Sequence, residues 1–537
     1  MILGVLIENE EFLPKYQCLL IDYLSALDDV EVHILRPNRV GISSSRRWKL
    51  NKLFWGGFKK IDSIFSWLTW RDADVGQPRK LNHNCTEHVV NLSRCTPILD
   101  DVDTSDDLDL PDFDLCVRLG FKILGPRLLS KLSCDVLSYH GGSLTNYRGA
   151  PAGFWEWISG ERVIKSTLQL LTPELDAGVA IREARTRVVQ HSWLQTRNEL
   201  LKAQIDLIIF EVLRFSRGSS LEKKPATYPK LPLNFNPSIK YTFIGCVKTA
   251  INSFWWIAKK MFKRKVWCIN ITNYRSKPHF GKNSFNLIGT KTEFWADPFI
   301  IKEEHNNLVF LCEKYSEGYG KIYRFEIQQL DNSIECVSAK CLLSHPKVHF
   351  SYPNLFCEEG RIYLCPEIQN SDKIHVYELN TDATQVINNF SLELDVHFEA
   401  FADPNIIKFE DKYYLFITLD FCGSGNLFGN CFVFVAESLR GKFQLLTNDA
   451  VFCCTSGRNA GQIYSNDFEV KLMSQAKIFD YGDGLSTKTY CFEKHSFVTS
   501  EDVFVPSKSL KNVSNIHHYV IGNHWSLIDY QIKVNRF

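Results

Sequence analysis

The chain has 537 residues, which is too long for one hydrophobic core of ordinary size, so we expect two or three domains. Its composition is typical of a folded protein, because 45% of the residues are hydrophobic and 23% are charged. The formal net charge of +1 excludes a bulk electrostatic attraction to nucleic acid, and no nucleic-acid partner is expected.

Cysteine usage and the N-terminus both favour a cytoplasmic location. The 17 cysteines are scattered and form no Cys-x-x-Cys pair, so a reducing compartment explains them more simply than a disulfide framework. The apolar start, Met1–Ile7, is short and has no basic leader, and it runs into the acidic segment 8–11. This favours a buried first strand over a signal peptide.

Residues 1–217 alternate short apolar runs with helical patterns. Strands are predicted at Ile2–Ile7, Val30–Leu35 and Leu115–Leu119, and helices at Tyr16–Leu27 and Gln195–Phe215. This alternation predicts an α/β domain with a mostly parallel sheet.

A polar, acidic stretch, Asn82–Asp112, interrupts that alternation. It contains Asp100, Asp101 and four further aspartates up to Asp109. Their spacing is too loose for an ion-binding loop, so we expect a solvated loop here.

Two short segments carry the components of an active site. Residues 139–151 read YHGGSLTNYRGAP and residues 175–178 read LDAG, so they supply an imidazole, a carboxylate and flexible glycine turns. The pattern resembles the N-terminal catalytic domain of the folate-dependent formyltransferases, which include glycinamide ribonucleotide, methionyl-tRNA and sugar N-formyltransferases. The separation of 36 residues between His140 and Asp176 also suits that family.

The resemblance implies formyl transfer from 10-formyltetrahydrofolate to an amine. Such a reaction needs stabilisation of an oxyanion and removal of a proton from nitrogen. By resemblance, His140 stabilises the oxyanion or relays the proton, and Asp176 positions His140 or a bridging water. Arg148 and Gly149 match the turn beyond the catalytic histidine. The folate side is matched by Gly120, Phe121, Ile123 and Leu124, which follow the predicted strand at Leu115–Leu119, and by Leu175.

One position departs from the family pattern. The family has an asparagine two residues before the histidine, where its amide donates to the oxyanion, and this chain has Ser138. Losing such a donor typically costs about two to three orders of magnitude in rate. Three alternatives follow: Ser138 acts through a water, another donor such as Asn146 reaches in, or the site has turned to a different reaction.

Residues 218–290 are predicted to be a connector, because several prolines break its first part. Residues 241–258 then form an apolar, aromatic segment whose only charge is Lys248, and basic residues follow up to Lys265. At helical spacing one face collects Phe243, Val247, Ile251, Phe254 or Trp255, Ala258 and Phe262.

Two interpretations of this segment stay open. One is peripheral contact of 241–265 with an anionic membrane. The other is a domain-bridging helix packed on its neighbours, which the polar residues Thr249, Asn252 and Ser253 favour.

Residues 291–537 contain a repeat of short β patterns. ADPFII at 296–301, SYPNLF at 351–356 and ADPNII at 402–407 each precede a second apolar run, and their prolines lie 55 and 51 residues apart. A weaker fourth copy begins near Asn459. Roughly 50 residues per unit over this region predict an all-β domain, a five-bladed β-propeller with four strands per blade.

This half resembles the five-bladed propellers of arabinanase- and levansucrase-like glycoside hydrolases. It resembles more closely the propeller of glucosamine inositolphosphorylceramide transferase-like proteins. The match is carried by WADPF at 295–299, HFSYP at 349–353, LCPE at 364–367 and ADP at 402–404.

The repeat supplies candidate carbohydrate-site residues. Glycosidases need two carboxylates flanking the scissile bond, and Asp297, Glu367 and Asp403 are candidates, with Glu313 a fourth. Tyr352 takes the place of aspartate in the second repeat and suits a sugar face. The alternative is structural, since Asp-Pro can simply open an inner strand.

The leading hypothesis is a transferase: a 10-formyltetrahydrofolate-dependent N-formyltransferase acting on an amino sugar or related amine in glycan or glycolipid biosynthesis, with the propeller binding the glycan. A second hypothesis places glycosyltransferase- or glycosidase-like chemistry in the propeller beside a degenerate first domain. A third is a carbohydrate-binding scaffold without catalysis. No P-loop, Rossmann glycine fingerprint or zinc-ligand spacing occurs, so no metal is expected. The sequence predicts no oligomeric state.

Overall fold

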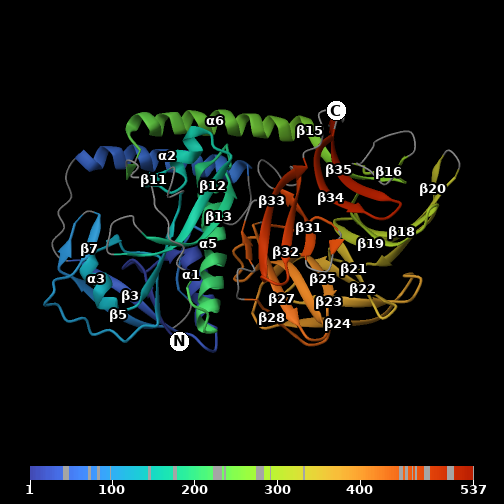
Figure 1. Cartoon of the computed structure of the whole chain (residues 1–537). Helices are drawn as coiled ribbons and strands as arrows, with labels where there is room; N and C mark the ends of the chain where they lie inside the picture. The colour runs from blue at the N-terminus through green and yellow to red at the C-terminus, as the bar shows by residue number, and fades with distance from the viewer. Residues whose placement is uncertain are drawn as a thin grey trace. The chain divides into compact units, whose positions relative to one another are not determined.

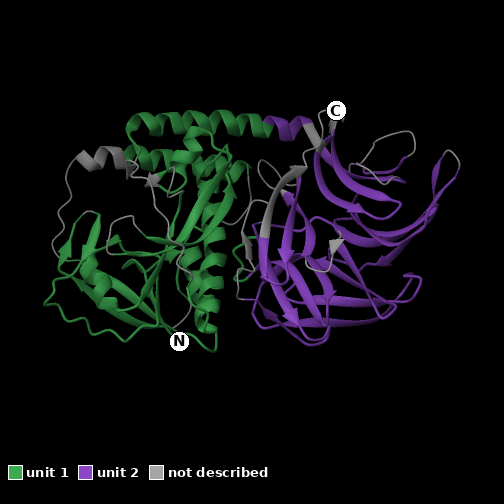
Figure 2. Cartoon of the chain, in the orientation of Figure 1, with its two compact units in different colours: residues 1–257, 421–426 green, residues 258–420, 427–537 purple. Residues whose placement is uncertain are grey.

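The computed structural model describes most of the chain as two compact units. Unit 1 comprises Met1–Ile257 with Phe421–Asn426, and unit 2 comprises Ala258–Asp420 with Leu427–Phe537 (Figure 2). The described residues are 1–39, 47–69, 74–81, 85–96, 98–142, 147–172, 178–221, 233–234, 237–273, 284–290, 292–330, 333–427, 429–446, 451–453, 457–461, 464–465, 469–476, 484–504 and 513–535.

Unit 1 is built on one seven-stranded sheet (Figure 1). Its order is β13 (Val179–Arg187), β12 (Val163–Leu170), β10 (Asp135–His140), β8 (Leu115–Arg118), β1 (Ile2–Leu6), β3 (Glu31–Arg39) and β5 (Thr86–Leu92). The strands from β10 to β5 are parallel, and β12 and β13 are antiparallel to their neighbours. The predicted α/β domain with a mostly parallel sheet is confirmed.

Six helices occur among the described residues: α1 (Lys15–Ser25), α2 (Arg47–Thr69), α3 (Pro126–Leu132), α4 (Phe154–Ser159), α5 (Trp193–Ser216) and α6 (Ile239–Phe262). The first five belong to unit 1, and α6 continues from unit 1 into unit 2. Helix α5 is buried along most of its length and packs on β12, β13 and three other helices. Ser192 caps its first turn, because the Ser192 hydroxyl accepts a hydrogen bond from the Gln195 amide at 3.2 Å. No helix in the described ranges has both the length and the apolar character that crossing a membrane requires.

The acidic stretch differs from the expected solvated loop. It contributes β5 to the main sheet and the short strand β7 (Leu99–Asp101), where Asp100 is fully buried. The Asp100 carboxylate accepts two hydrogen bonds from Arg39, at 2.8 and 2.7 Å. The local sequence did not reveal this burial, because the arginine that pairs with Asp100 lies 61 residues away.

Short strands complete unit 1. They are β2 (Leu13–Pro14) with β4 (Pro78–Arg79), β6 (Arg94–Cys95) and β9 (Ile123–Leu124) on either side of β7, and β11 (Arg148–Gly149) with β14 (Leu233–Asn234).

Unit 2 contains five groups of four strands in its described residues. They are β17 (Phe294–Glu303), β18 (Asn307–Ser316), β19 (Tyr319–Gln329) and β20 (Ile334–Leu343); β21 (Phe350–Glu358), β22 (Arg361–Ile368), β23 (Ile374–Leu379) and β24 (Val386–Leu394); β25 (Ala400–Phe409), β26 (Lys412–Asp420), β27 (Asn430–Ala436) and β28 (Lys442–Leu445); β30 (Tyr464–Ser465), β31 (Glu469–Ala476), β32 (Gly484–Cys491) and β33 (Ser496–Phe504); and β34 (Val513–Ile521), β35 (Ser526–Asn535), β15 (Lys263–Thr272) and β16 (Ser284–Ile288). A short extra strand, β29 (Val451–Cys453), pairs with β27, and β24 and β28 join the second and third groups.

The last group closes the propeller with strands from both ends of unit 2. Strand β15 pairs with β35 along its whole length, from Lys263 opposite Asn535 to Thr272 opposite Ser526. The sequence had assigned β15 and β16 to the connector, because a basic run directly after a helix gives no strand signal. With them in place, the predicted five-bladed β-propeller is confirmed.

Candidate functional site

The candidate residues of unit 1 that the structure describes lie where the parallel strands end. Strand β1 has β3 on one side and β8 on the other, so the chain connections diverge at the carboxyl ends of β1 and β8. Ligands of open α/β sheets bind at such a divergence. The predicted folate-side loop at Gly120–Leu124 follows β8, and Ser138 and His140 end the neighbouring strand β10.

Ser138 is held by a half-buried arginine that the sequence analysis did not single out. Arg118 stands opposite Ser138 in the pairing of β8 with β10, and its Nη1 donates to the Ser138 hydroxyl at 3.0 Å. Its other donors reach the carbonyls of Lys122 at 3.0 Å and Phe121 at 3.2 Å. Among the described residues no carboxylate hydrogen-bonds to this guanidinium. A hydroxyl backed by a half-buried cation thus stands at the position where the family that this sequence resembles has an amide.

Burial lowers the pKa of Arg118, and the nearby Asp100, Glu8 and Tyr16 oppose that shift. Arginine stays charged even when its pKa falls, because its ordinary value is above 12. The carboxyl edge of the sheet therefore carries a fixed positive charge.

The predicted folate-side residues divide into two kinds. A Cβ at Gly120 would come within 2.6 Å of the Ile7 carbonyl carbon, so only glycine lets the loop pass the end of β1. Ile123 is half-buried, whereas Phe121 and Leu124 pack into the hydrophobic core of unit 1. The loop therefore offers its backbone and Ile123, while Phe121 and Leu124 anchor it.

His140 is half-buried at the end of β10, where it pairs with Thr167 of β12. Asp176 and Leu175 lie outside the described residues, as does Asn146. Their predicted roles stay predictions. Arg148 and Gly149 form β11, which pairs with β14.

A second group missed from sequence is Glu156 of α4. Its side chain is buried, its Oε1 has no hydrogen-bond partner in the described part of the chain, and burial raises its pKa to about 7. A Cβ added at Gly142 would lie 3.1 Å from Glu156 Oε1 and 3.8 Å from His140 Nε2. The carboxyl and the imidazole therefore flank one glycine, and the pKa of about 7 lets the Glu156 carboxyl exchange a proton near neutral pH, as acid–base catalysis requires.

The three repeats of unit 2 share a distorted backbone. Strands β17, β21 and β25 each lose register with the next strand at the repeat proline. The residue before that proline has a positive φ: 50° at Asp297, 45° at Tyr352 and 47° at Asp403. Such a conformation costs a non-glycine residue about 1–2 kcal/mol and persists only where the surroundings impose it.

Carboxylates hold these bulges. The backbone N–H of Asp297 donates to Asp529 at 3.0 Å, that of Tyr352 to Asp297 at 3.3 Å, and that of Asp403 to Glu367 at 3.0 Å. The candidate carbohydrate residues are all buried, with Asp297, Glu367, Asp403 and Tyr352 at 4%, 9%, 1% and 1% exposure.

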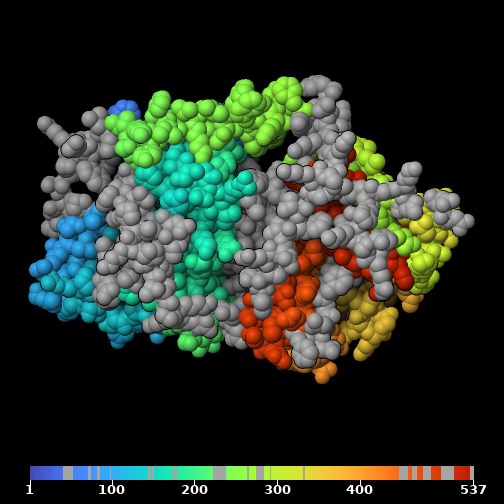
Figure 3. Space-filling view, turned by 45° about the horizontal axis from the view of Figure 1, so that its top comes forward, coloured from blue at the N-terminus to red at the C-terminus, as the bar shows by residue number. Residues whose placement is uncertain are grey.

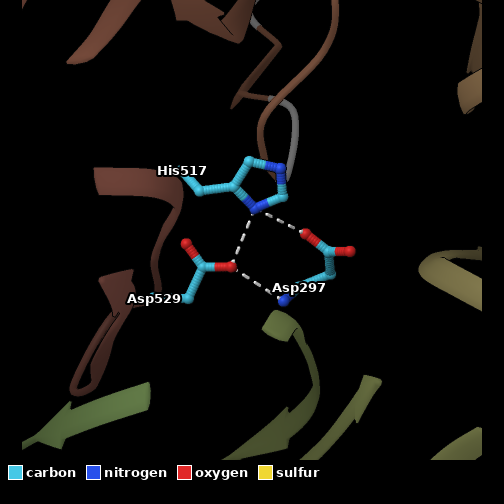
Figure 4. Close-up of side chains that lie close together, drawn as sticks. All are labelled: Asp297, His517 and Asp529. Atoms are coloured by element: carbon cyan, nitrogen blue, oxygen red, sulfur yellow. Dashed lines mark hydrogen bonds and ion pairs between the residues drawn. The ribbon is translucent and has the colours of Figure 1, made fainter. Parts of the chain in front are cut away.

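Asp297 belongs to a buried charged cluster (Figure 4). His517 Nδ1 lies 3.2 Å from its Oδ1 and 3.0 Å from Asp529 Oδ2. Burial alone would raise the pKa of Asp297, but His517 and His518 hold it well below its usual range. One oxygen of each aspartate and this nitrogen lie within 4.8 Å of one another, so these three side chains could also hold a divalent cation.

Asp403 and Glu367 are joined by an arginine. Arg458 Nη2 donates to Glu367 at 2.8 Å and to Asp403 at 3.1 Å, and its Nε donates to Asp403 as well. Burial, with Glu367 beside it, raises the pKa of Asp403 to about 7 although Arg458 opposes the shift. Glu313 is also buried, and its Oε1 lies 3.2 Å from His349 Nε2. Each predicted carboxylate is thus already engaged by an arginine or a histidine.

Comparison with known proteins gives different relatives for the two parts. Residues 272–520 match the family model of "Glucosamine inositolphosphorylceramide transferase 1, N-terminal". The resemblance predicted for the propeller is confirmed. The N-terminal region is similar to curated methionyl-tRNA formyltransferases, with 26% identity over 172 residues to that of Clostridium acetobutylicum and 26% over 117 residues to that of Thermodesulfovibrio yellowstonii.

These similarities are partial. The first formyltransferase match covers 29% of this chain and 53% of the relative, and the second 22% and 38%. Solved structures include an exo-1,5-alpha-L-arabinanase from a bovine ruminal metagenomic library (17% identity, 38% of this chain and 78% of that chain, TM-score 0.30). Another is phosphoribosylglycinamide formyltransferase from Anaplasma phagocytophilum (16% identity, 44% of this chain and 96% of that chain, TM-score 0.27). The fold assignment rests on the strand pairings.

Replacing Glu156 with glutamine tests the buried carboxyl. Because its pKa is raised from 4.5 to about 7, the folded state binds this proton more tightly than the unfolded state, and stability falls as pH rises through that window. We expect the free energy of unfolding of Glu156→Gln, compared with that of wild type at the same pH, to increase by up to about 3 kcal/mol as the pH rises from 4 to 8. Urea unfolding measures it. The exposed Glu10→Gln variant is the control, and a pH-independent difference would contradict the assignment.

Replacing Arg458 with methionine leaves Asp403 and Glu367 buried without their shared cation. We expect a loss of about 3–5 kcal/mol at pH 8, because an uncompensated buried charge is costly. The loss shrinks at pH 5, where Asp403, with its pKa of about 7, is already neutral. Chemical denaturation at pH 8 and at pH 5 measures the free energy of unfolding of this variant, with Arg361→Met, at an exposed arginine, as the control. Equal losses at the two pH values would refute this account.

Proposed function

We propose that unit 1 transfers the formyl group of 10-formyltetrahydrofolate to the amine of an amino sugar or related sugar-linked amine in glycan or glycolipid biosynthesis. The proposal assigns carbohydrate binding to unit 2. Its main support is the grouping of Arg118, Ser138, His140 and Glu156 at one edge of the sheet, together with the similarity of this region to proteins named methionyl-tRNA formyltransferase.

The donor set at this edge fits acyl transfer from such a cofactor. A half-buried cation, Arg118, meets the need for a positive charge beside developing negative charge. The unpartnered Oε1 of Glu156 and the imidazole of His140 provide acceptors for an amine proton. The backbone of Gly120 and the side chain of Ile123 would hold the cofactor, with Leu175 as a further predicted contact.

When bound, 10-formyltetrahydrofolate supplies an activated formyl group. His140 accepts or relays the proton lost by the attacking amine, and Glu156, with a pKa of about 7, exchanges a proton with the same region near neutral pH. Ser138 presents its hydroxyl at the end of β10, where Arg118 fixes its oxygen as an acceptor and leaves its O–H to donate. In this arrangement Arg118 positions Ser138, and its positive charge also stabilises the negative charge that develops on the reacting oxygen.

The competing hypothesis of propeller catalysis receives less support from the side chains. Hydrolysis of a glycosidic bond needs one protonated and one ionised carboxyl group on either side of that bond. Here Arg458 occupies the space between Asp403 and Glu367, and Asp297 is ion-paired with His517. These carboxylates are committed to holding the inner strands, so binding of carbohydrate is the better proposal for unit 2.

The direct test is formyl transfer by the full-length protein. Purified chain, 10-formyltetrahydrofolate and a panel of amino sugars and nucleotide-linked amino sugars are incubated, and N-formyl products are measured by mass spectrometry. We expect a formylated amino sugar and a loss of about two to four orders of magnitude in turnover in His140→Ala, the range typical of general acid–base groups.

Two controls make the result decisive. Asp297→Asn should leave turnover number unchanged if unit 2 has no part in the chemistry, and circular dichroism shows whether each variant is folded. Sugar cleavage or transfer that survives His140→Ala and fails in Asp297→Asn would replace this proposal with propeller catalysis. Binding of ligands without any turnover would leave the scaffold hypothesis.

Replacing Arg118 tests whether Ser138 works in place of the asparagine that the related formyltransferases have at this position. We expect Arg118→Gln to lower kcat by about two to three orders of magnitude with a smaller change in KM, because the stabilisation acts on charge that forms during the reaction. Ser138→Asn, which restores the amide of the related family, should retain activity or raise it. Steady-state kinetics with a thermal-stability check decides, and an unchanged kcat in Arg118→Gln would remove Arg118 from the reaction.

A further inference from the structure

Helices α2 and α6 lie side by side (Figure 1). A Cβ at Gly245 would lie 3.0 Å from the Phe58 ring, and one turn further along, Thr249 Oγ1 lies 3.2 Å from Asp62 Oδ1. The two helices are therefore in contact over successive turns and run parallel to each other. The residues of α6 buried here are Thr242, Gly245, Thr249 and Ser253.

The same short segment of chain lies beneath both helices. Asp62 of α2 accepts a hydrogen bond from the Leu194 amide at 2.6 Å. Asn252 and Ser253 of α6 donate to the carbonyls of Gln190 and His191, at 2.9 and 3.2 Å. Because residues 190–194 support both helices from one side, the opposite faces of α2 and α6 look outward together.

Those outward faces are apolar. Of the 23 exposed large hydrophobic side chains in the described part of the protein, 6 lie on α2 and 10 on α6. Trp67 is 75% exposed, Phe243 68%, Phe254 64% and Trp255 60%. We call this surface the apolar plate: Leu53, Phe54, Ile61, Ile64, Trp67 and Leu68 of α2, with Tyr241, Phe243, Ile244, Val247, Ile251, Phe254 and Trp255 of α6. Figure 3 shows α6, in light green, running along the molecular surface.

This is the reverse of an ordinary surface helix, which buries its apolar stripe and exposes its polar face. An exposed apolar surface of this extent marks an interaction site. The charged residues of the two helices indicate which kind of partner this surface binds. Lys59, Lys60, Lys240 and Lys259 are exposed on the two helices, and the only acidic residue in either helix, Asp62, is fully buried.

We propose that the apolar plate docks the protein peripherally on an anionic lipid surface. Tryptophan, tyrosine and phenylalanine insert at the boundary between headgroups and acyl chains, and lysines beside them attract anionic lipid. A second copy of this chain fits less well, because a self-complementary interface brings the lysines of both copies together without acidic partners. The proposal goes beyond the formyl-transfer proposal and does not depend on it.

The test uses the full-length protein and vesicles of two compositions: phosphatidylcholine alone, and phosphatidylcholine with about 30% phosphatidylserine, a content that gives the negative surface potential of a cytoplasmic leaflet. Co-sedimentation measures binding, and tryptophan emission reports insertion. We expect binding to the anionic vesicles with a blue shift of emission, and weaker binding at high salt.

Three sets of variants locate the contact. Trp67→Gln with Trp255→Gln should weaken binding by about tenfold or more per tryptophan, the effect of losing one buried aromatic side chain. Lys59→Gln, Lys60→Gln and Lys259→Gln should each weaken it on the order of fivefold. The matched control, Val337→Gln with Ile387→Gln, removes exposed apolar residues of unit 2 and should bind as wild type.

Either of two results would overturn the proposal. One is sedimentation with anionic vesicles no greater than with the neutral ones, or binding that the tryptophan variants retain. The other is self-association in analytical ultracentrifugation that the tryptophan variants abolish without any vesicle binding, which would assign the plate to a second copy of the chain. Circular dichroism of each variant confirms that the fold is intact.

Discussion

A charge removed from water must find a partner, and this constraint organises both units. In unit 1 the guanidinium of Arg118 is compensated by a hydroxyl and two carbonyls, and this fixes the loop after β8 against the end of β10. In unit 2 the charges occur as pairs, Asp297 with His517 and Asp403 with Arg458. The difference matters for function, because a cation whose hydrogen-bond partners are all neutral retains more of its electrostatic field for a ligand than one in a direct ion pair.

The propeller shows what the paired charges achieve. Each repeat puts a residue with positive φ before proline, a conformation that the local sequence disfavours. The carboxylates of Asp529, Asp297 and Glu367 accept the backbone N–H groups at these points, so the strain is offset by hydrogen bonds to charged acceptors. The Asp-Pro motifs therefore have a structural explanation that does not require catalysis.

The sequence predicted those parts of this arrangement that are determined by interactions between residues close together in the chain. Strand and helix positions, the histidine turn and the spacing of the repeat were readable, because each is encoded within a few residues. Arg118 was missed because its partner Ser138 is 20 residues away, and Arg458 because Asp403 is 55 residues away. Glu156 left one readable signal, as the only charge in the helix FWEWIS. The apolar face of α6 was predicted correctly, but the sequence left open whether that face is exposed or packed, since which face is buried depends on α2 and the segment 190–194.

The two proposals reinforce each other physically if the acceptor amine is carried on a lipid-linked glycan. A protein held at the surface by the apolar plate meets such an acceptor at a raised effective concentration, as any second binding event does once the first has occurred. Unit 2 then adds affinity for the sugar without having to supply chemistry. Under this arrangement the reaction at Ser138 and His140 can tolerate weak recognition of the amine itself, because attachment to the membrane and to the glycan has already restricted its motion.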